Sequence, residues 1–150
     1  MKKTPFVTKK QLEEIVKEYP TPFHLYDEAG IRKNAQALKD AFSWNKGFRE
    51  YFAVKAEPNP FVIEIMQKEG CGFDCSSLTE LMLSEATGVQ PRDIMFSSND
   101  TPAEEFAYAD KLGAIINLDD ITHIDCLEET LGHIPEIISC RYNPGGLFKI

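Results

Sequence analysis

Lys55 is the residue of this chain whose type and position point most directly to chemistry. It ends the short, aromatic and β-branched run Tyr51 to Lys55, which predicts a buried strand. Side chains alternate along a strand, so Lys55 is expected on the same face as Tyr51 and Ala53. Burial there would favour the neutral amine, which can form an imine with an aldehyde cofactor. The alternative for such a lysine is a strand-end position from which the amine reaches solvent.

Polar side chains follow nearly every predicted strand. We predict six strands: Phe23–Tyr26, Tyr51–Lys55, Gly72–Asp74, Ile94–Phe96, Ala114–Asn117 and Ile137–Tyr142. Helix capping accounts for Asp119 or Asp120 after the fifth of these strands. It does not account for Lys55, Asp74 or Arg141. Because the carboxyl ends of parallel strands meet at one edge of a sheet, these three side chains form a candidate site.

Helical segments separate the predicted strands and must position these residues. We predict helices at Glu28–Phe42, Pro60–Glu69, Leu78–Thr87, Pro102–Leu112 and Asp120–Leu131, after an amphipathic helix near Lys9 to Glu18. This alternation predicts parallel strands with right-handed crossovers, in either a doubly wound sheet or a (β/α)8 TIM barrel. No G-x-G-x-x-G follows the first strand, and the strand ends are polar, so we predict the α/β barrel.

Chemical signals mark the ends of the predicted helices. Two starts pair a capping side chain with a first-turn proline, at Asn59-Pro60 and Thr101-Pro102. Two segments have the spacing of a capping box, Ser77 to Glu80 and Thr101 to Glu104. Glycines suited to a left-handed C-terminal cap follow four helices, at Gly70, Gly88, Gly113 and Gly132.

The length bears on the domain organisation. We expect residues 1–20 to form a helical lead-in and residues 21–150 to form part of a barrel, with about its first six βα units. A complete barrel takes about 250 residues. We therefore expect the 150-residue chain to be the N-terminal part of a longer protein.

Composition and charge exclude several classes of partner. A formal net charge of −8 argues against a surface for nucleic acid or anionic membrane. No apolar run has membrane-spanning length and no signal peptide follows Met1, so a cytoplasmic location is expected. Cys71 and Cys75 lie on either side of Asp74 but lack the ligand spacing of zinc sites. We expect buried, reduced thiols there and no metal.

Four blocks, in order, closely resemble the fold-type III, pyridoxal-phosphate-dependent amino-acid decarboxylases. The blocks are Thr21-Pro22-Phe23-His24-Leu25-Tyr26-Asp27, Tyr51-Phe52-Ala53-Val54-Lys55-Ala56-Glu57-Pro58-Asn59-Pro60, Gly72-Phe73-Asp74-Cys75-Ser76-Ser77-Leu78-Thr79-Glu80-Leu81 and Arg141-Tyr142-Asn143-Pro144-Gly145-Gly146. The resemblance covers most of the chain from about Tyr19 onward. Within the family it is greatest to the diaminopimelate decarboxylases, which make lysine.

The resemblance implies a pyridoxal 5'-phosphate cofactor and four site residues. Lys55 matches the lysine that binds the cofactor covalently. Asp74 and Glu80 match acidic positions that line the cofactor and lysine region, and a helix-capping role is the alternative for Glu80. Arg141 matches the arginine near the phenolic oxygen of the cofactor. Glu57 departs from the family, which often has a small or neutral polar residue there.

The resemblance also implies a small amino-acid substrate, a homodimer and a C-terminal β domain. The stacking histidine, the phosphate loop, the partner of the pyridinium nitrogen and the substrate-binding residues are expected beyond Ile150. None of the three histidines matches the stacking position; they are His24, His123 and His133.

Several alternatives remain open from the sequence. Ornithine, arginine and carboxynorspermidine decarboxylases share the family. Alanine racemase is related, but its lysine is followed by a different turn from Glu57-Pro58-Asn59-Pro60. Outside enzymes, the alternatives are a barrel that binds pyridoxal phosphate without catalysis and a structural half-barrel that another segment completes.

Overall fold

Five parallel strands form the sheet of this protein, and its order follows the sequence. The computed structural model describes residues 4–142. The strands are β1 (Tyr51–Ala53), β2 (Gly72–Cys75), β3 (Ile94–Phe96), β4 (Ile115–Leu118) and β5 (Ile138–Cys140), in the order β1-β2-β3-β4-β5. In a doubly wound sheet the strand order reverses at a switch point. The consecutive order seen here is instead the winding of a (β/α) barrel.

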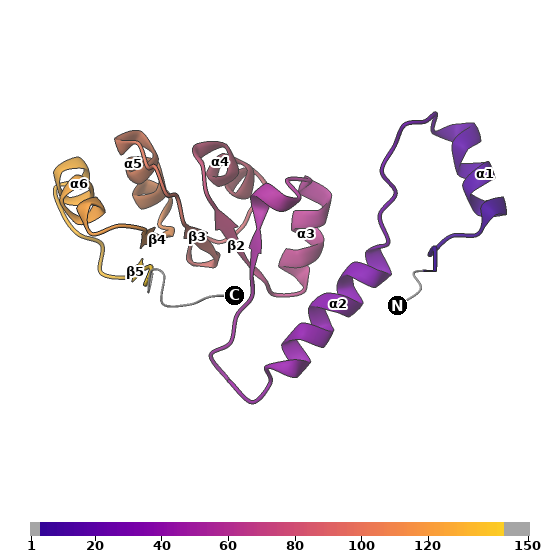
Figure 1. Ribbon diagram of the computed structural model, residues 1–150, viewed down its shortest axis with the longest axis horizontal. Coiled ribbons are helices and arrows are strands. Elements are labelled where there is room, and N and C mark those ends of the chain that lie inside the picture. Colours follow the sequence, from indigo (N-terminus) through magenta and orange to yellow (C-terminus); the bar gives the residue numbers. More distant parts are fainter. Residues whose placement is uncertain (1–3, 143–150) are drawn as a thin grey trace, which may run out of the picture.

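Helices cover one face of the sheet. The α-helices are α1 (Lys9–Glu18), α2 (Glu28–Ala41), α3 (Pro60–Lys68), α4 (Leu78–Ala86), α5 (Ala103–Leu112) and α6 (Thr122–Leu131), with short 3-10 turns η1 (Val54–Ala56) and η2 (Pro91–Asp93). Helices α3 to α6 stand in a row on the same side of the strands (Figure 1). The chain is therefore an open segment of a barrel wall, with helices outside and the other face of the sheet toward the barrel interior.

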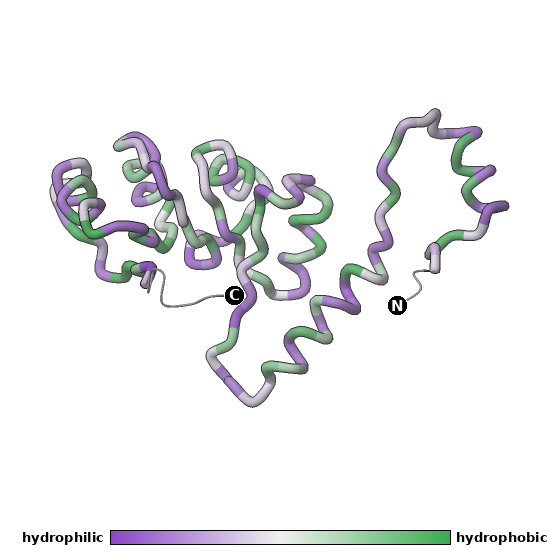
Figure 2. Tube along the Cα trace, viewed as in Figure 1, coloured by the Kyte–Doolittle hydropathy of each residue, from purple (hydrophilic) through white to green (hydrophobic). Residues whose placement is uncertain are grey.

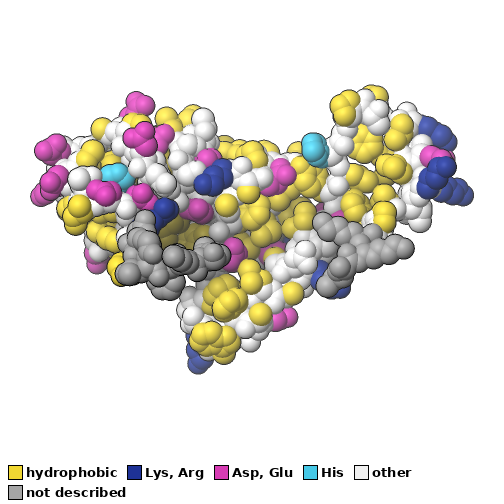
Figure 3. Space-filling view, viewed as in Figure 1, with side chains coloured by type: hydrophobic (Ala, Val, Ile, Leu, Met, Phe, Trp, Pro, Cys, Tyr) yellow, Lys and Arg dark blue, Asp and Glu magenta, His cyan; other side chains and the backbone are white. Residues whose placement is uncertain are grey.

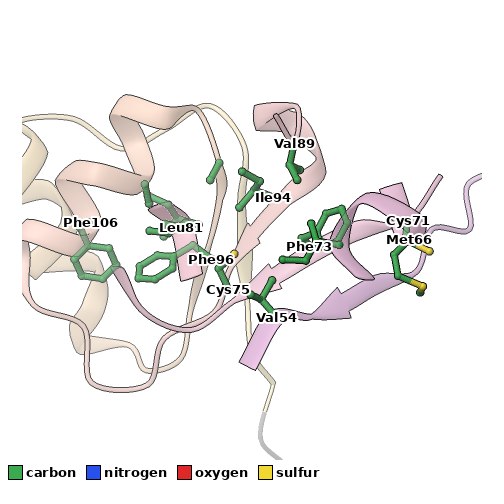
Figure 4. Close-up of a cluster of buried hydrophobic side chains, with 14 of the residues drawn as sticks. Val54, Met66, Cys71, Phe73, Cys75, Leu81, Val89, Ile94, Phe96 and Phe106 are labelled. Atoms are coloured by element: carbon green, nitrogen blue, oxygen red, sulfur yellow. The ribbon is translucent and has the colours of Figure 1, made fainter. Parts of the chain in front are cut away.

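The core lies between the sheet and this row of helices. Every second strand residue points toward the helices, and apolar side chains of the helices pack against these residues in the same layer. Its fully buried members include Phe73, Ile94, Phe96 and Ile116 from the strands, and Ile63, Leu81, Phe106 and Leu127 from the helices. Figure 4 shows Phe96 and Phe106 side by side, and their rings meet edge to face with centroids 6.4 Å apart.

The opposite face of the sheet carries both apolar and polar side chains, including Met95 and Ile115 in register with Asp74. On β2 the alternation places Phe73 and Cys75 in the core and Asp74 on the open face. Tyr51 lies over Gly72 on the same face, and a Cβ on this glycine would come within 2.7 Å of the ring. The open face is thus filled by Tyr51 near the start of the strands and becomes polar toward their carboxyl ends.

The predicted first strand, Phe23–Tyr26, is absent. This segment is extended but pairs with no strand in the described structure, and His24, Leu25 and Tyr26 are exposed. Its contact with the sheet region is a side-chain hydrogen bond, from Tyr26 Oη to Glu57 at 3.1 Å. A β-branched or aromatic run becomes a strand only when a neighbouring backbone satisfies its hydrogen bonds. Five strands, rather than the predicted six, are therefore found among residues 4–142.

The helix-end predictions are confirmed at most positions and wrong at two. Gly70, Gly88, Gly113 and Gly132 all have positive φ, between 74° and 81°. Asn59 caps α3 by accepting a hydrogen bond from the Phe61 N–H at 3.0 Å. The Thr101 capping box is wrong, because α5 begins after Pro102 and has no side-chain cap.

The second wrong capping prediction concerns Ser77, whose side chain does not cap the backbone of α4. Glu105 on the next helix takes that role, accepting from the Leu78 N–H at 3.0 Å. The Glu105 carboxylate satisfies the first unpaired N–H of α4, whereas a Ser77 cap would have accepted from the second or third. Sequence spacing alone could not reveal this contact, since 27 residues separate the two partners.

Helix α1 is amphipathic but has no buried residue. Thr8 and Gln11 close a capping box at its start. Leu12 and Val16 are each 40% exposed on its apolar side, and Figure 2 shows hydrophobic and hydrophilic positions interleaved along it. Among the helices of residues 4–142, none combines the length and the apolar character needed to cross a membrane.

Helix α2 is joined to the end of α3 by a partly buried ion pair. Arg32 Nη1 lies 2.7 Å from Glu69 Oε1, and Gln36 donates a further hydrogen bond to this carboxylate at 3.1 Å. The hydrogen bond from Arg32 is the main reason that the pKa of Glu69 lies below its ordinary value of 4.5. A carboxylate with a lowered folded-state pKa stabilises the fold above its unfolded pKa, and this contribution is lost as the pH falls through the folded value.

Replacing Glu69 with glutamine is therefore expected to lower the urea midpoint at neutral pH. The difference between variant and parent should shrink as the pH falls below about 4.5, because the unfolded carboxylate is protonated first and the folded one only at a lower pH. Urea unfolding at neutral pH and at about pH 3 measures this. Glu64→Gln is the matched control, because Glu64 is exposed and lies 3.8 Å from Lys68. An equal loss for the Glu69 variant at both pH values would contradict the ion-pair explanation.

Candidate active site at the carboxyl edge of the sheet

Three of the four predicted site residues lie at the carboxyl ends of strands. Lys55 follows β1, Asp74 is the third residue of β2, and Arg141 follows β5. Since all neighbouring strands are parallel, these positions share one edge of the sheet. The edge prediction from the sequence is confirmed, whereas the details differ for each residue.

Lys55 is not part of the strand. Strand β1 ends at Ala53, and Lys55 lies in the η1 turn, with its side chain exposed. The expected buried position beside Tyr51 and Ala53 is therefore wrong in the described structure. The neighbouring Val54 is fully buried on the helix-facing side, which is the side of Phe52. The amine stands at the open rim of the sheet, which is the solvent-reaching alternative.

Glu57 lies two residues beyond Lys55 and is partly buried. Its carboxylate accepts the hydrogen bond from Tyr26, which joins the segment before α2 to the loop after Lys55. The unusual glutamate of the sequence is therefore engaged with a tyrosine, and the loop that holds Lys55 is fixed on one side by Tyr26 and on the other by the Asn59 cap of α3.

Asp74 points to the open face of the sheet and is partly buried. Its Oδ1 accepts a hydrogen bond from Ser97 Oγ, 2.5 Å away, on the neighbouring strand end. Among the ion pairs of residues 4–142, the partner of Arg141 is Asp119 rather than Asp74. A hydroxyl donor instead holds the carboxylate in place, in the same layer of the sheet as Ala53.

Further along the same face, Asn117 on β4 accepts a hydrogen bond from Ser139 on β5 at 2.8 Å. The register pairs these two residues directly. Together with Asp74 and Ser97, they form a polar band across β2 to β5 on the open face. Neither Ser97 nor Ser139 was among the candidate site residues, although both occupy open-face positions that strand alternation reveals.

Glu80 has a structural role in the described chain. Its carboxylate accepts hydrogen bonds from the Ser76 N–H at 2.9 Å and from the Ser77 hydroxyl at 3.0 Å. It therefore ties the loop after β2 to the first turn of α4. This is not the predicted capping box, because the backbone donor belongs to the residue before the cap. Through these hydrogen bonds, the Glu80 carboxylate holds the conformation of the loop after β2.

Arg141 and Asp119 form an ion pair at the far end of the edge. Arg141 Nε lies 2.8 Å from Asp119 Oδ1. Both residues line a cavity of about 360 Å³, whose wall also includes Asp120, Ile121, Ile124 and Tyr142. The sequence explained Asp119 or Asp120 as a helix cap, and the structure divides these roles. Asp120 accepts from the Thr122 N–H at 2.9 Å, while Asp119 is left to contact Arg141.

The cysteines are structural where they are buried. Cys75 lies in the core, where burial raises the pKa of its thiol to about 12. Its Sγ contacts Ser84 Oγ at 3.3 Å. Within residues 4–142, no three His, Cys, Asp or Glu side chains are grouped as metal ligands. The inward-facing thiols of Cys71 and Cys75 thus pack as small apolar groups.

The charges of the surface are unevenly distributed. Figure 3 shows acidic side chains gathered over α5 and α6, and basic ones at α1. At the carboxyl edge itself, the cationic side chains of Lys55 and Arg141 lie among carboxylates, and Asp119 pairs with Arg141.

The family of the chain follows from comparison with known proteins. Residues 28–145 match the family described as "Pyridoxal-dependent decarboxylase, pyridoxal binding domain". The chain belongs to this family. The matched range contains Lys55, Asp74, Glu80 and Arg141, so the cofactor of the family, pyridoxal 5'-phosphate, is also the one expected from the sequence.

Curated relatives agree on the family and differ in name. The chain is 42% identical over 136 residues to Protein TabA of Pseudomonas amygdali pv. tabaci, covering 91% of this chain and 31% of the relative. It is 35% identical over 134 residues to a diaminopimelate decarboxylase of Thermoplasma acidophilum, covering 89% and 32% respectively. The chain thus spans about a third of the length of these relatives.

Solved structures confirm the barrel. Lysine decarboxylase from Selenomonas ruminantium superposes with a TM-score of 0.83 at 21% identity, over 99% of this chain and 39% of that one. Diaminopimelate decarboxylase from M. jannaschi gives a TM-score of 0.73 at 27% identity, over 78% of this chain and 28% of that one. The predicted (β/α) barrel class, present in part, is confirmed by the parallel sheet and these neighbours.

The residues at the carboxyl edge fit pyridoxal phosphate. The cofactor needs an accessible amine, a donor for its phenolic oxygen and room for a planar ring. Lys55 provides an exposed amine on a fixed turn, and Arg141 provides a guanidinium on the wall of a cavity. Between them the open face carries Ala53, Asp74 and Ser97, which are small or polar side chains.

Proposed function

We propose that this chain is the barrel segment that carries the cofactor lysine of an amino-acid decarboxylase, with residues 1–20 as a helical lead-in and residues 21–150 as part of the barrel. The observation that supports this most strongly is the position of Lys55 directly beyond β1, on the same edge as Asp74 and Arg141, in a chain of the pyridoxal-binding family. Barrel enzymes keep their chemistry at this edge.

The spacing of Lys55 and Arg141 agrees with a shared ligand. They follow the first and the last strand of a five-stranded sheet, so four strand spacings separate them. In a flat sheet this would be about 19 Å, at about 4.8 Å per strand. Four strand spacings are half of the circumference of an eight-stranded barrel. In a closed barrel the two residues would therefore face each other across the barrel axis.

Each residue has a distinct role in the proposed reaction. When bound, pyridoxal phosphate supplies a ring that accepts the electron pair left by departing carbon dioxide. The Lys55 amine would hold the cofactor through its aldehyde carbon and, when displaced by the substrate amine, would hold a proton within reach of the reacting carbon. Arg141 would donate N–H groups to the phenolic oxygen and so orient the ring. Asp74, fixed by Ser97, provides negative charge that balances the cationic lysine.

For the substrate we propose meso-diaminopimelate, which would make the product L-lysine. The sequence resemblance and the names of several relatives at 30% identity or more support this choice. Other amino acids remain candidate substrates for two reasons. The chain is 42% identical to Protein TabA, and it is similar in structure to ornithine decarboxylase of Entamoeba histolytica at 26% identity. A cytoplasmic homodimer is part of the proposal; the family resemblance supports the homodimer, and the cytoplasmic location is the expectation from the sequence.

An assay of the complete protein tests the proposed function. We use "complete protein" for this chain together with the further residues that its proposed parent contains. Carbon dioxide release should be fastest, in kcat/KM, with meso-diaminopimelate among diaminopimelate, lysine, ornithine and arginine. The 150-residue chain alone should release none, because the interior of its five-stranded sheet is open to water. Failure of the complete protein to decarboxylate any of these amino acids would contradict the proposal.

A further inference from the structure

Asp119 and Arg141 are placed side by side by the backbone. Strands β4 and β5 pair Leu118 with Cys140, and each of the two charged residues is the next one along its strand. The Arg141 N–H donates to the Leu118 carbonyl oxygen at 2.9 Å, which continues the strand pairing past the end of β5. Their side chains therefore start from fixed neighbouring positions, two residues beyond the Asn117 and Ser139 pair of the polar band.

The contact involves one particular edge of the guanidinium. Asp119 Oδ1 lies 2.8 Å from Arg141 Nε, and the side chains are 21% and 45% exposed. Oδ1 itself is buried and has no hydrogen bond of good geometry in the described structure, so the pair is an ion contact without an aligned N–H donor. Because the carboxylate lies at the Nε edge, the four N–H donors of the two terminal nitrogens remain outside this contact.

The guanidinium held in this way lines the cavity of about 360 Å³ at the carboxyl edge. An unrestrained arginine side chain has many rotamers, and ordering it on binding a ligand is unfavourable. A partly buried carboxylate, with its Oδ1 at the Nε edge of the guanidinium, removes part of that unfavourable ordering free energy before the ligand arrives. Asp120 lies next in sequence and lines the same cavity, but its carboxylate is bonded to Thr122.

We propose that Asp119 is a positioning residue, which fixes Arg141 by its Nε edge and so directs the terminal N–H groups toward the phenolic oxygen of the cofactor. This proposal rests on the proposed function. Asp119 would touch neither cofactor nor substrate and would act only through Arg141. Removing it should therefore weaken cofactor binding only when Arg141 is present.

A double-mutant cycle on the complete protein tests this dependence. The dissociation constant of pyridoxal phosphate is measured by absorbance titration for the parent, Asp119→Asn, Arg141→Ala and the double variant. Asp119→Asn should weaken binding about tenfold in the parent background and less than about twofold beside Arg141→Ala. Asp120→Asn removes an equal charge from the same cavity wall and should change the affinity less than about twofold.

The outcomes separate this inference from the proposed function. Equal weakening by Asp119→Asn with and without Arg141, or equal effects of Asp119→Asn and Asp120→Asn, would overturn the positioning role while leaving cofactor binding intact. A parent protein that binds no pyridoxal phosphate would overturn both. Thermal unfolding of the cofactor-free proteins is the second measurement, since a loss of affinity caused by general unfolding would lower the midpoint of Asp119→Asn as well. Such a parallel loss would also count against the positioning role.

Discussion

Replacing Lys55 with alanine in the complete protein is expected to abolish the cofactor adduct that borohydride traps, and to lower decarboxylation by roughly 10²–10⁴-fold. The amine of Lys55 is the group that binds the cofactor covalently in the proposed reaction. Its exposed position on the η1 turn leaves it free to react at the rim of the barrel. Absorbance after reduction and single-turnover assays measure the two effects.

Two further variants separate covalent binding from charge. Lys55→Arg keeps a positive side chain at the same position but cannot form the imine, so it should lose the adduct as completely as alanine does. Lys46→Ala removes another exposed lysine, from the loop between α2 and β1, and should retain the adduct in full. A trapped adduct of normal yield in Lys55→Arg would remove Lys55 from its role.

Replacing Phe96 with alanine is expected to have the largest effect on stability. The ring is fully buried on β3 and meets Phe106 of α5 edge to face. Truncating a buried phenylalanine to alanine typically lowers the free energy of unfolding by about 3–5 kcal/mol, since apolar contacts are lost and a cavity remains. Urea unfolding followed by circular dichroism measures the change. The single tryptophan, Trp44, is 78% exposed and therefore a poor fluorescence reporter.

Phe61→Ala is the matched control, because the same ring is removed from a surface position. Phe61 is 74% exposed at the start of α3. Its loss should change the free energy of unfolding by no more than about 0.5 kcal/mol. If Phe96→Ala yields no folded protein, Phe96→Leu provides a smaller truncation at the same position. Equal effects at Phe61 and Phe96 would contradict the assigned core.

The helices could be predicted from sequence because their ends carry local chemical signals. Helix α4 was predicted at Leu78–Thr87 and is found at Leu78–Ala86, with Gly88 in the left-handed conformation just beyond. Three further glycines behave in the same way. The parallel direction of the strands also followed from local pattern, whereas the alternation of strands and helices left two architectures open.

Features that depend on distant partners could not be predicted in the same way. Phe23–Tyr26 has strand composition, but no neighbouring backbone pairs with it in the described structure. Lys55 was expected inside the strand, whereas it lies in a 3-10 turn with its side chain exposed at the rim. The partners of Asp74 and Arg141 also come from neighbouring strand ends, so only the fold reveals them.

Asp119 illustrates what a closer reading of strand alternation could have found. It lies two residues beyond Asn117, hence on the same face of the sheet, and its helix-capping interpretation concealed this position. The structure assigns the capping contact to Asp120 alone. The sequence feature that could have revealed Asp119 was therefore an acidic residue two positions after Asn117, on the open face of the sheet.

Peptide mapping of the reduced adduct tests the central claim most directly. The complete protein is loaded with one equivalent of pyridoxal phosphate, reduced with borohydride, digested and analysed by mass spectrometry. We expect the added mass on the single peptide that contains Lys55. Adduct distributed over exposed lysines such as Lys10, Lys46 and Lys111, with none on Lys55, would contradict the assignment of this edge of the sheet as the cofactor site.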